Sequence, residues 1–354
     1  MQLSNTISSQ VRPVFIIGAG GIVVNAHLPA YKLAGFNIQG IYDSDTEKSR
    51  AAASRFAVPR AFSTMDEMLR HAPTNAVFDV AVPGSAMLQV LTQLPDNAIV
   101  LIQKPMGENL AAARQILQLT RRKKMLAAVN FQLRYAPAVV EARRMIDAGL
   151  LGEIADIEIN INVYTPWHLW KFLFDAPRVE ILYHSIHYID LIRSFLGNPE
   201  KVLAKTTGHP AMKELASVRS NIIMDYGHMV RASIATNHAH LYGLTMQQSY
   251  IKIEGSKGAV KIDLGVLKNY PHGEPERFAY IVLQEEQTAE WKQKEMEGNW
   301  FPHAFIGSMM QLMEAADQGF KVPDNSVEDC INTMACVEAA YISNEKGGIV
   351  PEFE

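Results

Sequence analysis

Cysteine is scarce in this chain, and long apolar runs and an excess of charge of one sign are both lacking. The two cysteines, Cys330 and Cys336, are six residues apart on one predicted helix. That spacing puts them on opposite sides of the helix, so they cannot bridge each other. So low a cysteine content fits a reducing compartment and predicts a cytoplasmic location.

The other absences narrow the class of protein. No apolar run reaches the ~20 residues that a membrane helix needs, and residues 1–10 are polar, unlike a secretory signal. The net charge of −4 shows no basic excess, so neither a membrane nor a nucleic-acid partner is expected. With 48% hydrophobic and 20% charged residues, the composition is that of a soluble globular protein. A chain of 354 residues exceeds one ordinary core, which predicts two domains.

A glycine-rich turn follows the first apolar run, residues 14–17. Gly18 permits a tight turn from strand to helix, and Gly20 lets the backbone come close to a pyrophosphate at the helix N-terminus. Val23 stands where a third glycine is usual in such turns. The alternative is a turn between strand and helix that binds no ligand. The residues of this turn predicted to line a dinucleotide are Gly18, Gly20, Gly21 and Ile22.

An acidic residue, Asp43, ends the second predicted strand, residues 38–42. Its carboxylate can accept hydrogen bonds from a ribose 2′-OH and repel a 2′-phosphate, so we expect NAD rather than NADP. Lys48 and Arg50 on the following helix could soften this preference.

Strand and helix patterns alternate through residues 1–130. This predicts a doubly wound parallel sheet, an α/β Rossmann domain, with ligands beyond the carboxyl ends of the strands. The turns at Gly18, Pro83 and Gln103–Pro105 all follow apolar strands and should meet at that edge. Residues 131–354 show period-two alternation instead, first in Ile154–Val163 and then in six similar runs. They predict an α+β domain with an open, mainly antiparallel sheet.

Taken in order along the chain, the motifs of this sequence resemble those of the Gfo/Idh/MocA family of NAD(P)-dependent sugar and polyol oxidoreductases. The resemblance implies a Rossmann domain, a second domain whose open sheet often makes the oligomer contact (a dimer or tetramer), and catalysis at a cleft between the domains. The matching stretches are Gly18–Ile22 with His27–Ala30, Tyr42–Asp45, Gln103–Met106, Phe131–Pro137, Gly149–Ile154 and His187–Gly197.

Lys104 matches the catalytic lysine of the family's Glu-Lys-Pro motif. Pro105 matches its proline, whereas Gln103 departs from the usual glutamate. A lysine beside a nicotinamide can hydrogen-bond the reacting hydroxyl and polarise the carbonyl as it forms. The alternative is a solvated loop lysine.

His187 falls where the family keeps its catalytic histidine, whose near-neutral pKa suits proton exchange with the hydroxyl. The aspartate usual four residues earlier is Tyr183 here. His184, three residues before His187, can substitute as a partner or second proton carrier. The alternative is that Tyr183 supplies the hydrogen bond through its phenol and His184 is purely structural. Metal binding by both histidines and Asp190 is geometrically possible, but the family generally needs no metal for hydride transfer, so none is expected.

The remaining site residues are less sharply defined. Pro83 and Gly84 resemble the family's turn beside the nicotinamide ribose, and Gln132 is expected at the cofactor. Arg134 can pair with a cofactor phosphate or a substrate hydroxyl, or form an interdomain salt bridge. Trp167 and Trp170 suit the weakly polar face of a sugar ring, or form an apolar plug. Further candidates for hydroxyl contacts are Arg178, Glu180, Asn237, His238 and His303.

Three functions follow from these expectations. The first is a dehydrogenase acting on a CH–OH group of a monosaccharide, sugar derivative or polyol. The second is NAD-assisted glycoside cleavage or epimerisation without net redox change. The third is a non-catalytic nucleotide-binding sensor, against which the retention of Lys104 and His187 argues.

Overall fold

The computed structural model describes residues 12–270, 273–283, 290–319 and 321–348. The chain divides into two compact units. Unit 1 comprises Met1–Gln132 and Ala304–Ile331, and unit 2 comprises Leu133–His303 and Asn332–Glu354. The polar segment 1–10, interpreted above as no secretory signal, lies outside the described residues. None of the helices in the described ranges is long and apolar enough to cross a membrane.

Unit 1 is built on a six-stranded parallel sheet in the order β3-β2-β1-β4-β5-β6. Every residue of β1, β4, β5 and β6 is buried, because helices cover both faces of a parallel sheet. The strands are β1 (Val14–Ile17), β2 (Ile38–Tyr42), β3 (Ala61–Phe62), β4 (Val77–Val80), β5 (Ile99–Ile102) and β6 (Leu126–Val129).

Side-chain caps start several helices of unit 1. Asp45, Thr64 and Asn109 accept hydrogen bonds from backbone N–H groups in the first turns of α2, α3 and α5. Helix α8 belongs with this unit although it follows the second sheet in the chain. The helices are η1 (Val23–His27, a π-helical turn), α1 (Leu28–Leu33), α2 (Thr46–Phe56), α3 (Met65–His71), α4 (Gly84–Gln93), α5 (Leu110–Arg122) and α8 (His303–Asp317).

Unit 2 contains an eight-stranded sheet in the order β14-β13-β12-β11-β7-β10-β9-β8. All neighbours are antiparallel except β7 and β10, which are parallel. Buried and exposed residues alternate along β9, β10 and β11, so one face is covered and the other open. The strands are β7 (Ile154–Asn162), β8 (Lys201–Thr207), β9 (Arg219–Asp225), β10 (Arg231–Asn237), β11 (Gln248–Gly255), β12 (Gly258–Asp263), β13 (Arg277–Val282) and β14 (Lys292–Lys294).

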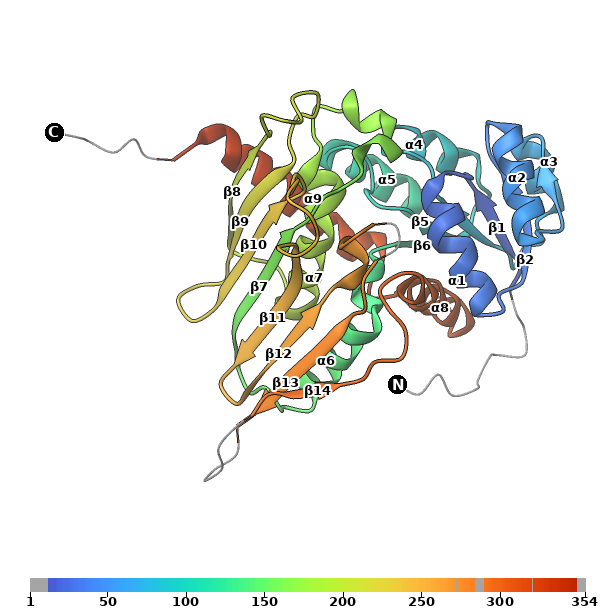
Figure 1. The fold of residues 1–354 in the computed structure, drawn as a ribbon. Helices are drawn as coiled ribbons and strands as arrows, with labels where there is room; N and C mark the ends of the chain where they lie inside the picture. The colour runs from blue at the N-terminus through green and yellow to red at the C-terminus, as the bar shows by residue number, and fades with distance from the viewer. Residues whose placement is uncertain (1–11, 271–272, 284–289, 320, 349–354) are drawn as a thin grey trace. The chain divides into compact units, whose positions relative to one another are not determined.

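Helices α6 (Pro137–Asp147) and α7 (Ile186–Leu196) lie on the covered side of this sheet, against β12 and β10 (Figure 1). The last part of α9 (Val327–Lys346) supports the edge strand β8. The side chains of Ser343 and Asn344 in α9 accept hydrogen bonds from backbone N–H groups of β8. Short turns complete the unit: η2 (Gln132–Tyr135), η3 (Trp167–Leu169), η4 (Lys171–Phe174), η5 (Ile181–Ser185, π-helical) and η6 (Gly265–Leu267).

The predicted fold class is confirmed: a doubly wound parallel sheet is followed by a mainly antiparallel open sheet. Sequence patterns did not predict the short strands β3 and β14, because two or three residues are too few to show alternation. They also missed the π-helical geometry of η1 and η5, since the apolar spacing of one such turn differs little from that of an α-helix. Both cysteines are buried, and neither forms a disulfide.

Candidate functional site

The glycine turn has the geometry that its sequence predicts. Gly18 has φ +107°, and a Cβ there would lie 2.3 Å from the carbonyl oxygen of Ala81, so only glycine fits. A Cβ on Gly20, in contrast, would meet no atom within 4 Å, and one on Gly21 would only reach Asn25 at 4.0 Å. The space over Gly20 and Gly21 is therefore not needed for packing within the protein, which is what a pyrophosphate-binding turn requires.

Asp43 holds the glycine turn from the end of β2. Its Oδ2 accepts a hydrogen bond from the Ala19 N–H at 2.6 Å, and its Oδ1 accepts one from the Asp45 N–H at 2.8 Å. Each carboxylate oxygen has a further lone pair, so the side chain can still accept from a ribose diol. Ile22, at the start of the helical segment, is partly exposed beside this turn.

Two further turns follow β4 and β5 on the same carboxyl edge of the sheet. Pro83 precedes the first residue of α4, and a Cβ on Gly84 would come within 3.3 Å of Gly107 and Glu108. Lys104 and Pro105 follow β5 and are joined by a cis peptide bond. The structure thus brings the predicted cofactor and lysine turns to one edge of the sheet in unit 1.

Lys104 is only partly exposed, while Gln103 and Pro105 on either side are buried. Burial lowers the pKa of Lys104 from its ordinary value to about 8. A lysine with that pKa exchanges its proton near neutral pH, unlike a solvated loop lysine. Gln132, which follows β6, is also buried, and no described residue hydrogen-bonds its Oε1. An amide oxygen in this state fits the predicted contact with a cofactor.

In unit 2, η5 and α7 carry the predicted histidines. His187 is buried, and its ring lies edge-on to that of Trp300 at 5.8 Å. The backbone N–H of Trp300 donates to Glu276 Oε1 at 2.7 Å, and burial raises the pKa of Glu276 to about 7 despite that bond. Sequence reasoning missed Glu276, which is distant from His187 in the chain and belongs to no motif.

His184 lies against a different group of side chains. Its ring stacks on that of Trp167 at 4.8 Å with an interplanar angle of 7°, and meets His238 edge-on at 4.3 Å. The π-helical turn contributes to this arrangement, because it rotates residues 181–185 relative to the α-helix that follows. Tyr183 packs against Phe172 instead.

A buried carboxylate, Glu180, supports this group. It accepts hydrogen bonds from Ser185 at 2.7 Å and from Ser220, and its Oε1 lies 3.6 Å from His238 Nε2. Burial acts to raise the pKa of Glu180, but the hydrogen bond and charge of His238 with the two serine bonds outweigh it and lower the pKa. Glu180 and His238, candidates for hydroxyl contacts, thus form a buried pair.

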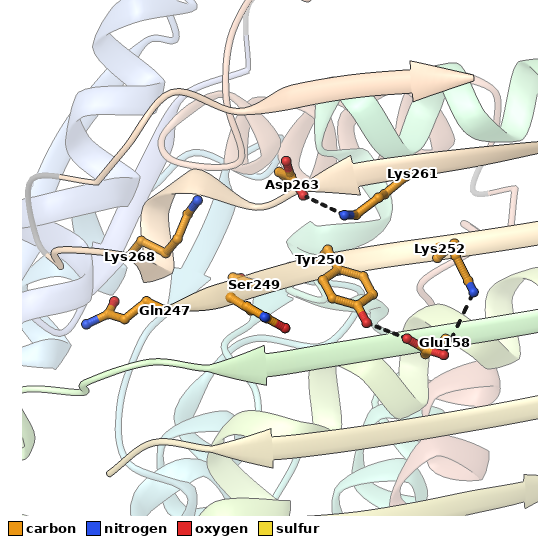
Figure 2. Close-up of a pocket in the computed structure, with 9 residues that line it drawn as sticks. Glu158, Gln247, Ser249, Tyr250, Lys252, Lys261, Asp263 and Lys268 are labelled. Carbon is orange, nitrogen blue, oxygen red and sulfur yellow. Dashed lines mark hydrogen bonds and ion pairs between the residues drawn. The ribbon is translucent and has the colours of Figure 1, made fainter. Parts of the chain in front are cut away.

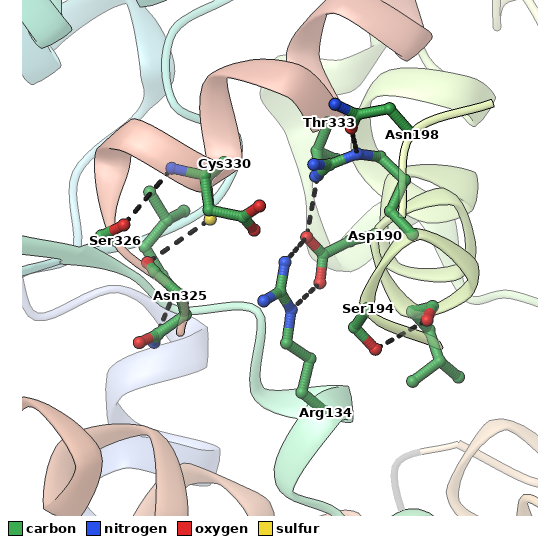
Figure 3. A network of polar contacts seen from close by, with 12 residues as sticks. Arg134, Asp190, Ser194, Asn198, Asn325, Ser326, Cys330 and Thr333 are labelled. Carbon is green, nitrogen blue, oxygen red and sulfur yellow. Dashed lines mark hydrogen bonds and ion pairs between the residues drawn. The ribbon is translucent and has the colours of Figure 1, made fainter. Parts of the chain in front are cut away.

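Arg134 is engaged within unit 2. Its guanidinium donates twice to Asp190, at 2.6 Å each, and Thr333 donates to the same carboxylate at 2.8 Å (Figure 3). Asp190, which the metal alternative requires as a ligand, is committed to these donors. A role for Arg134 toward cofactor or substrate stays a prediction.

The other candidates have defined partners. Arg178 forms a bidentate pair with Glu338 at 2.8 and 2.9 Å, and Asn237 donates to Asn162 at 2.9 Å. Burial lowers the pKa of His303. Trp170 is partly exposed, with its ring 5.6 Å from that of Tyr270.

A polar groove crosses the open face of the second sheet. Tyr250 donates to Glu158 there, Lys252 lies 3.9 Å from the same carboxylate, and Lys261 pairs with Asp263 at 3.8 Å (Figure 2). The sequence analysis singled out none of these residues, because alternating charged residues are typical of any solvated sheet face.

The fold and the glycine turn are those of a dinucleotide-binding protein, and two family models together match nearly the whole chain. "Oxidoreductase family, NAD-binding Rossmann fold" matches residues 12–131, and "Oxidoreductase family, C-terminal alpha/beta domain" matches residues 143–351. The chain belongs to this family, GFO_IDH_MocA, which confirms the resemblance seen in its motifs and the NAD-binding nature of the first domain.

Individual relatives have low sequence identity to this chain but align with most of its length. The chain is 22% identical over 341 residues to D-apiose dehydrogenase of Paraburkholderia graminis, covering 95% of this chain and 88% of that one. An oxidoreductase from Agrobacterium radiobacter, solved with NAD+, L-tartaric acid and magnesium, has a TM-score of 0.79 at 18% identity, covering 96% and 98% of the two chains. Aldose-aldose oxidoreductase from Caulobacter crescentus, complexed with glycerol, has a TM-score of 0.77 at 15% identity, covering 96% and 99%.

Proposed function

We propose that this protein is an NAD-dependent dehydrogenase that acts on a CH–OH group of a monosaccharide, sugar derivative or polyol. The observation that carries the proposal is Lys104, whose pKa burial lowers to about 8, on a strand-end turn of an NAD-binding sheet. The names of D-apiose dehydrogenase and aldose-aldose oxidoreductase support a sugar substrate.

In this proposal each residue has a distinct task. Bound NAD supplies the hydride acceptor in the oxidative direction. Lys104 donates a hydrogen bond to the substrate oxygen and stabilises the negative charge that grows on it. His187 would take the hydroxyl proton onto its imidazole as the substrate carbonyl forms. His184 assists as orienting partner or second proton carrier, and Trp167 and Trp170 hold the apolar side of the sugar ring.

The cofactor residues support this scheme. Gly18, Gly20, Gly21 and Ile22 would hold the pyrophosphate, Asp43 the adenosine ribose, and Pro83, Gly84, Pro105 and Gln132 the nicotinamide half. The open space at Gly20 and the free lone pairs of Asp43 are the features of this chain that fit such a ligand.

A panel of polyols and aldoses with NAD, followed by absorbance near 340 nm, tests the proposal. We expect NADH to accumulate with at least one member. Tightly retained cofactor and sugar conversion without net NADH would instead indicate NAD-assisted cleavage or epimerisation. NADH binding without turnover on any member would indicate a sensor.

We also propose a cytoplasmic homo-oligomer, a dimer or a tetramer, with no membrane or nucleic-acid partner. Leu203 and Ile223 support the oligomer. They are cross-strand neighbours on β8 and β9, and about half of each side chain is exposed.

A further inference from the structure

A chain of buried polar groups runs through unit 1 to the lysine turn. Asp79 lies in the middle of β4 and His27 in η1, and both are fully buried. Asp79 Oδ2 lies 2.6 Å from His27 Nδ1 and accepts a hydrogen bond from Tyr31 at 2.9 Å. A carboxylate in the centre of a buried strand is costly unless it is paired, so its presence calls for a role.

The chain continues on the other side of the imidazole. Asn130, directly after β6, places its Nδ2 3.3 Å from His27 Nε2 and donates to Gln103 Oε1 at 3.0 Å. Gln103 immediately precedes Lys104, and its own N–H donates to the Val80 carbonyl oxygen at 2.9 Å. Four side chains from four separate segments thus link β4 to the turn that carries the lysine.

Donor and acceptor counting assigns the proton on His27. An amide nitrogen can only donate, so His27 Nε2 must accept from Asn130 and Nδ1 must carry the hydrogen. That hydrogen points at Asp79, which can only accept when ionised. Burial, followed by the charge and hydrogen bond of Asp79, raises the pKa of Tyr31, so its phenol also remains a donor to Asp79. The hydrogen bonds among Tyr31, Asp79, His27 and Asn130 agree with one arrangement of protons, in which Asp79 Oδ1 and Asn130 Oδ1 have no hydrogen-bond partner among the described residues.

We infer that Asp79, acting through His27 and Asn130, is a positioning residue for the Gln103–Lys104–Pro105 turn. Asp79 holds His27 as the Nδ1–H tautomer, and this tautomer holds the amide of Asn130 with its nitrogen toward both His27 and Gln103. If the imidazole carried its hydrogen on Nε2, Asn130 would have to present its oxygen instead. Gln103 would then lose the donor that now fixes its side chain beside Lys104.

The expected effect of Asp79 on turnover rests on the proposed function. The tautomer of His27 and the order of the Gln103–Lys104–Pro105 turn do not. The tautomer of His27 is therefore measured first, by 15N chemical shifts of its ring in the full chain, assigned with His27→Gln. We expect Nδ1–H in the parent and in Asp79→Asn, whose amide oxygen still accepts. Asp79→Leu, which keeps the branching at Cγ and the number of heavy atoms but removes the acceptor, should lose the Nδ1–H form. An unchanged tautomer in Asp79→Leu overturns the inference, whether or not the protein oxidises sugars.

Turnover and amide exchange supply the second readout. Asp79→Leu should lower kcat on the order of ten-fold, with the Kd for NADH changed less than about two-fold, because small displacements of a reacting group cost rate rather than binding. Amide hydrogen exchange of Gln103 and Gly107 should quicken in the same variant. Asp79→Asn should restore both values to near those of the parent.

Tyr31→Phe is the matched control, since it removes one hydrogen bond to the same carboxylate without interrupting the path to Gln103. Its kcat and its amide hydrogen exchange at Gln103 should stay near those of the parent, and its loss of stability should be no larger than that of Asp79→Leu. A loss of kcat in Tyr31→Phe as large as in Asp79→Leu would mean that Asp79 only stabilises the fold. If the parent has no turnover, the tautomer and exchange arms still decide the inference, and only the proposed function fails.

Discussion

At the scale of single residues, Lys104 governs the expected pH dependence. Its protonated form donates to the substrate oxygen, and burial lowers its pKa to about 8. Activity limited by this group is therefore present below pH ~8 and lost as the pH rises through that value. We expect an alkaline limb near pH 8 in kcat/KM for the parent. Gln103→Glu, which puts a carboxylate beside the lysine, should move this limb to higher pH.

Lys104→Met tests the same residue more directly. Turnover should fall by roughly two to four orders of magnitude while cofactor affinity is nearly intact, the range for loss of a proton-transfer or electrostatic group. The Kd for NADH serves as the control for folding. Near-normal turnover in a folded variant would return Lys104 to the status of a solvated lysine.

The roles of His187, His184 and Tyr183 in proton transfer can also be tested with single-residue variants. His187→Ala should abolish most activity, and His184→Ala should reduce it less, because orienting a base matters less than being one. The ring of His184 stacks on Trp167 and that of Tyr183 packs on Phe172. If the phenol of Tyr183 supplies the hydrogen bond and His184 is purely structural, Tyr183→Phe is the damaging change and His184→Ala mainly costs stability. The pH profile of kcat/KM for the parent and the three variants is the measurement. His187 acting as a base gives an acidic limb, on which activity is lost as the pH falls, whereas Lys104 gives the alkaline limb near pH 8. An acidic limb that survives in His187→Ala excludes His187 as the titrating base.

Asp43 is expected to set cofactor preference. Its carboxylate repels a 2′-phosphate, so catalytic efficiency with NAD should exceed that with NADP, and comparable efficiencies would contradict the assignment. The double change Asp43→Ser with Lys48→Arg should move the preference toward NADP. The same change removes the hydrogen bonds to the Ala19 and Asp45 N–H groups, so some loss of stability is expected as well.

At the scale of elements, the β1–η1 turn separates a structural glycine from a ligand-binding one. Gly18→Ala would force a Cβ to 2.3 Å from the Ala81 carbonyl oxygen, at a positive φ. We expect it to destabilise the fold by ~2 kcal/mol or more in urea unfolding. Gly20→Ala meets no protein atom within 4 Å, so it should leave stability within ~1 kcal/mol and weaken NAD binding. Equal effects of the two changes on stability would contradict this division.

At the scale of the whole molecule, the open sheet face is expected to join subunits. Leu203→Glu with Ile223→Glu places charges on an exposed apolar cross-strand pair. Sedimentation should show a dimer or tetramer for the parent and smaller species for the double variant. Lys201→Glu on the same strand is a control, because it shifts the net charge as much as the double variant does without removing apolar surface. A monomeric parent would contradict the proposed oligomer.

The sequence by itself determined the fold class and the position of the cofactor turn, because both depend on local patterns. Apolar β-branched runs form buried strands, period-two alternation forms a half-exposed sheet, and a glycine that must adopt φ > 0 is visible as a glycine. The turn at Gly18 and the strands of both sheets, apart from the short β3 and β14, could be predicted for this reason. Motif order was also sufficient for the family.

Only the tertiary structure decided which buried polar groups meet. Asp79 and His27 are 52 residues apart, and Asn130 is 103 residues from His27, so no periodicity connects them. Glu180, His238 and Ser220 likewise come together only when α7 packs on the second sheet. The bidentate contact of Arg134 with Asp190 also joins residues that are 56 positions apart, and it depends on how unit 2 packs. Hydrogen bonds between distant segments depend on packing geometry, which a sequence pattern does not encode.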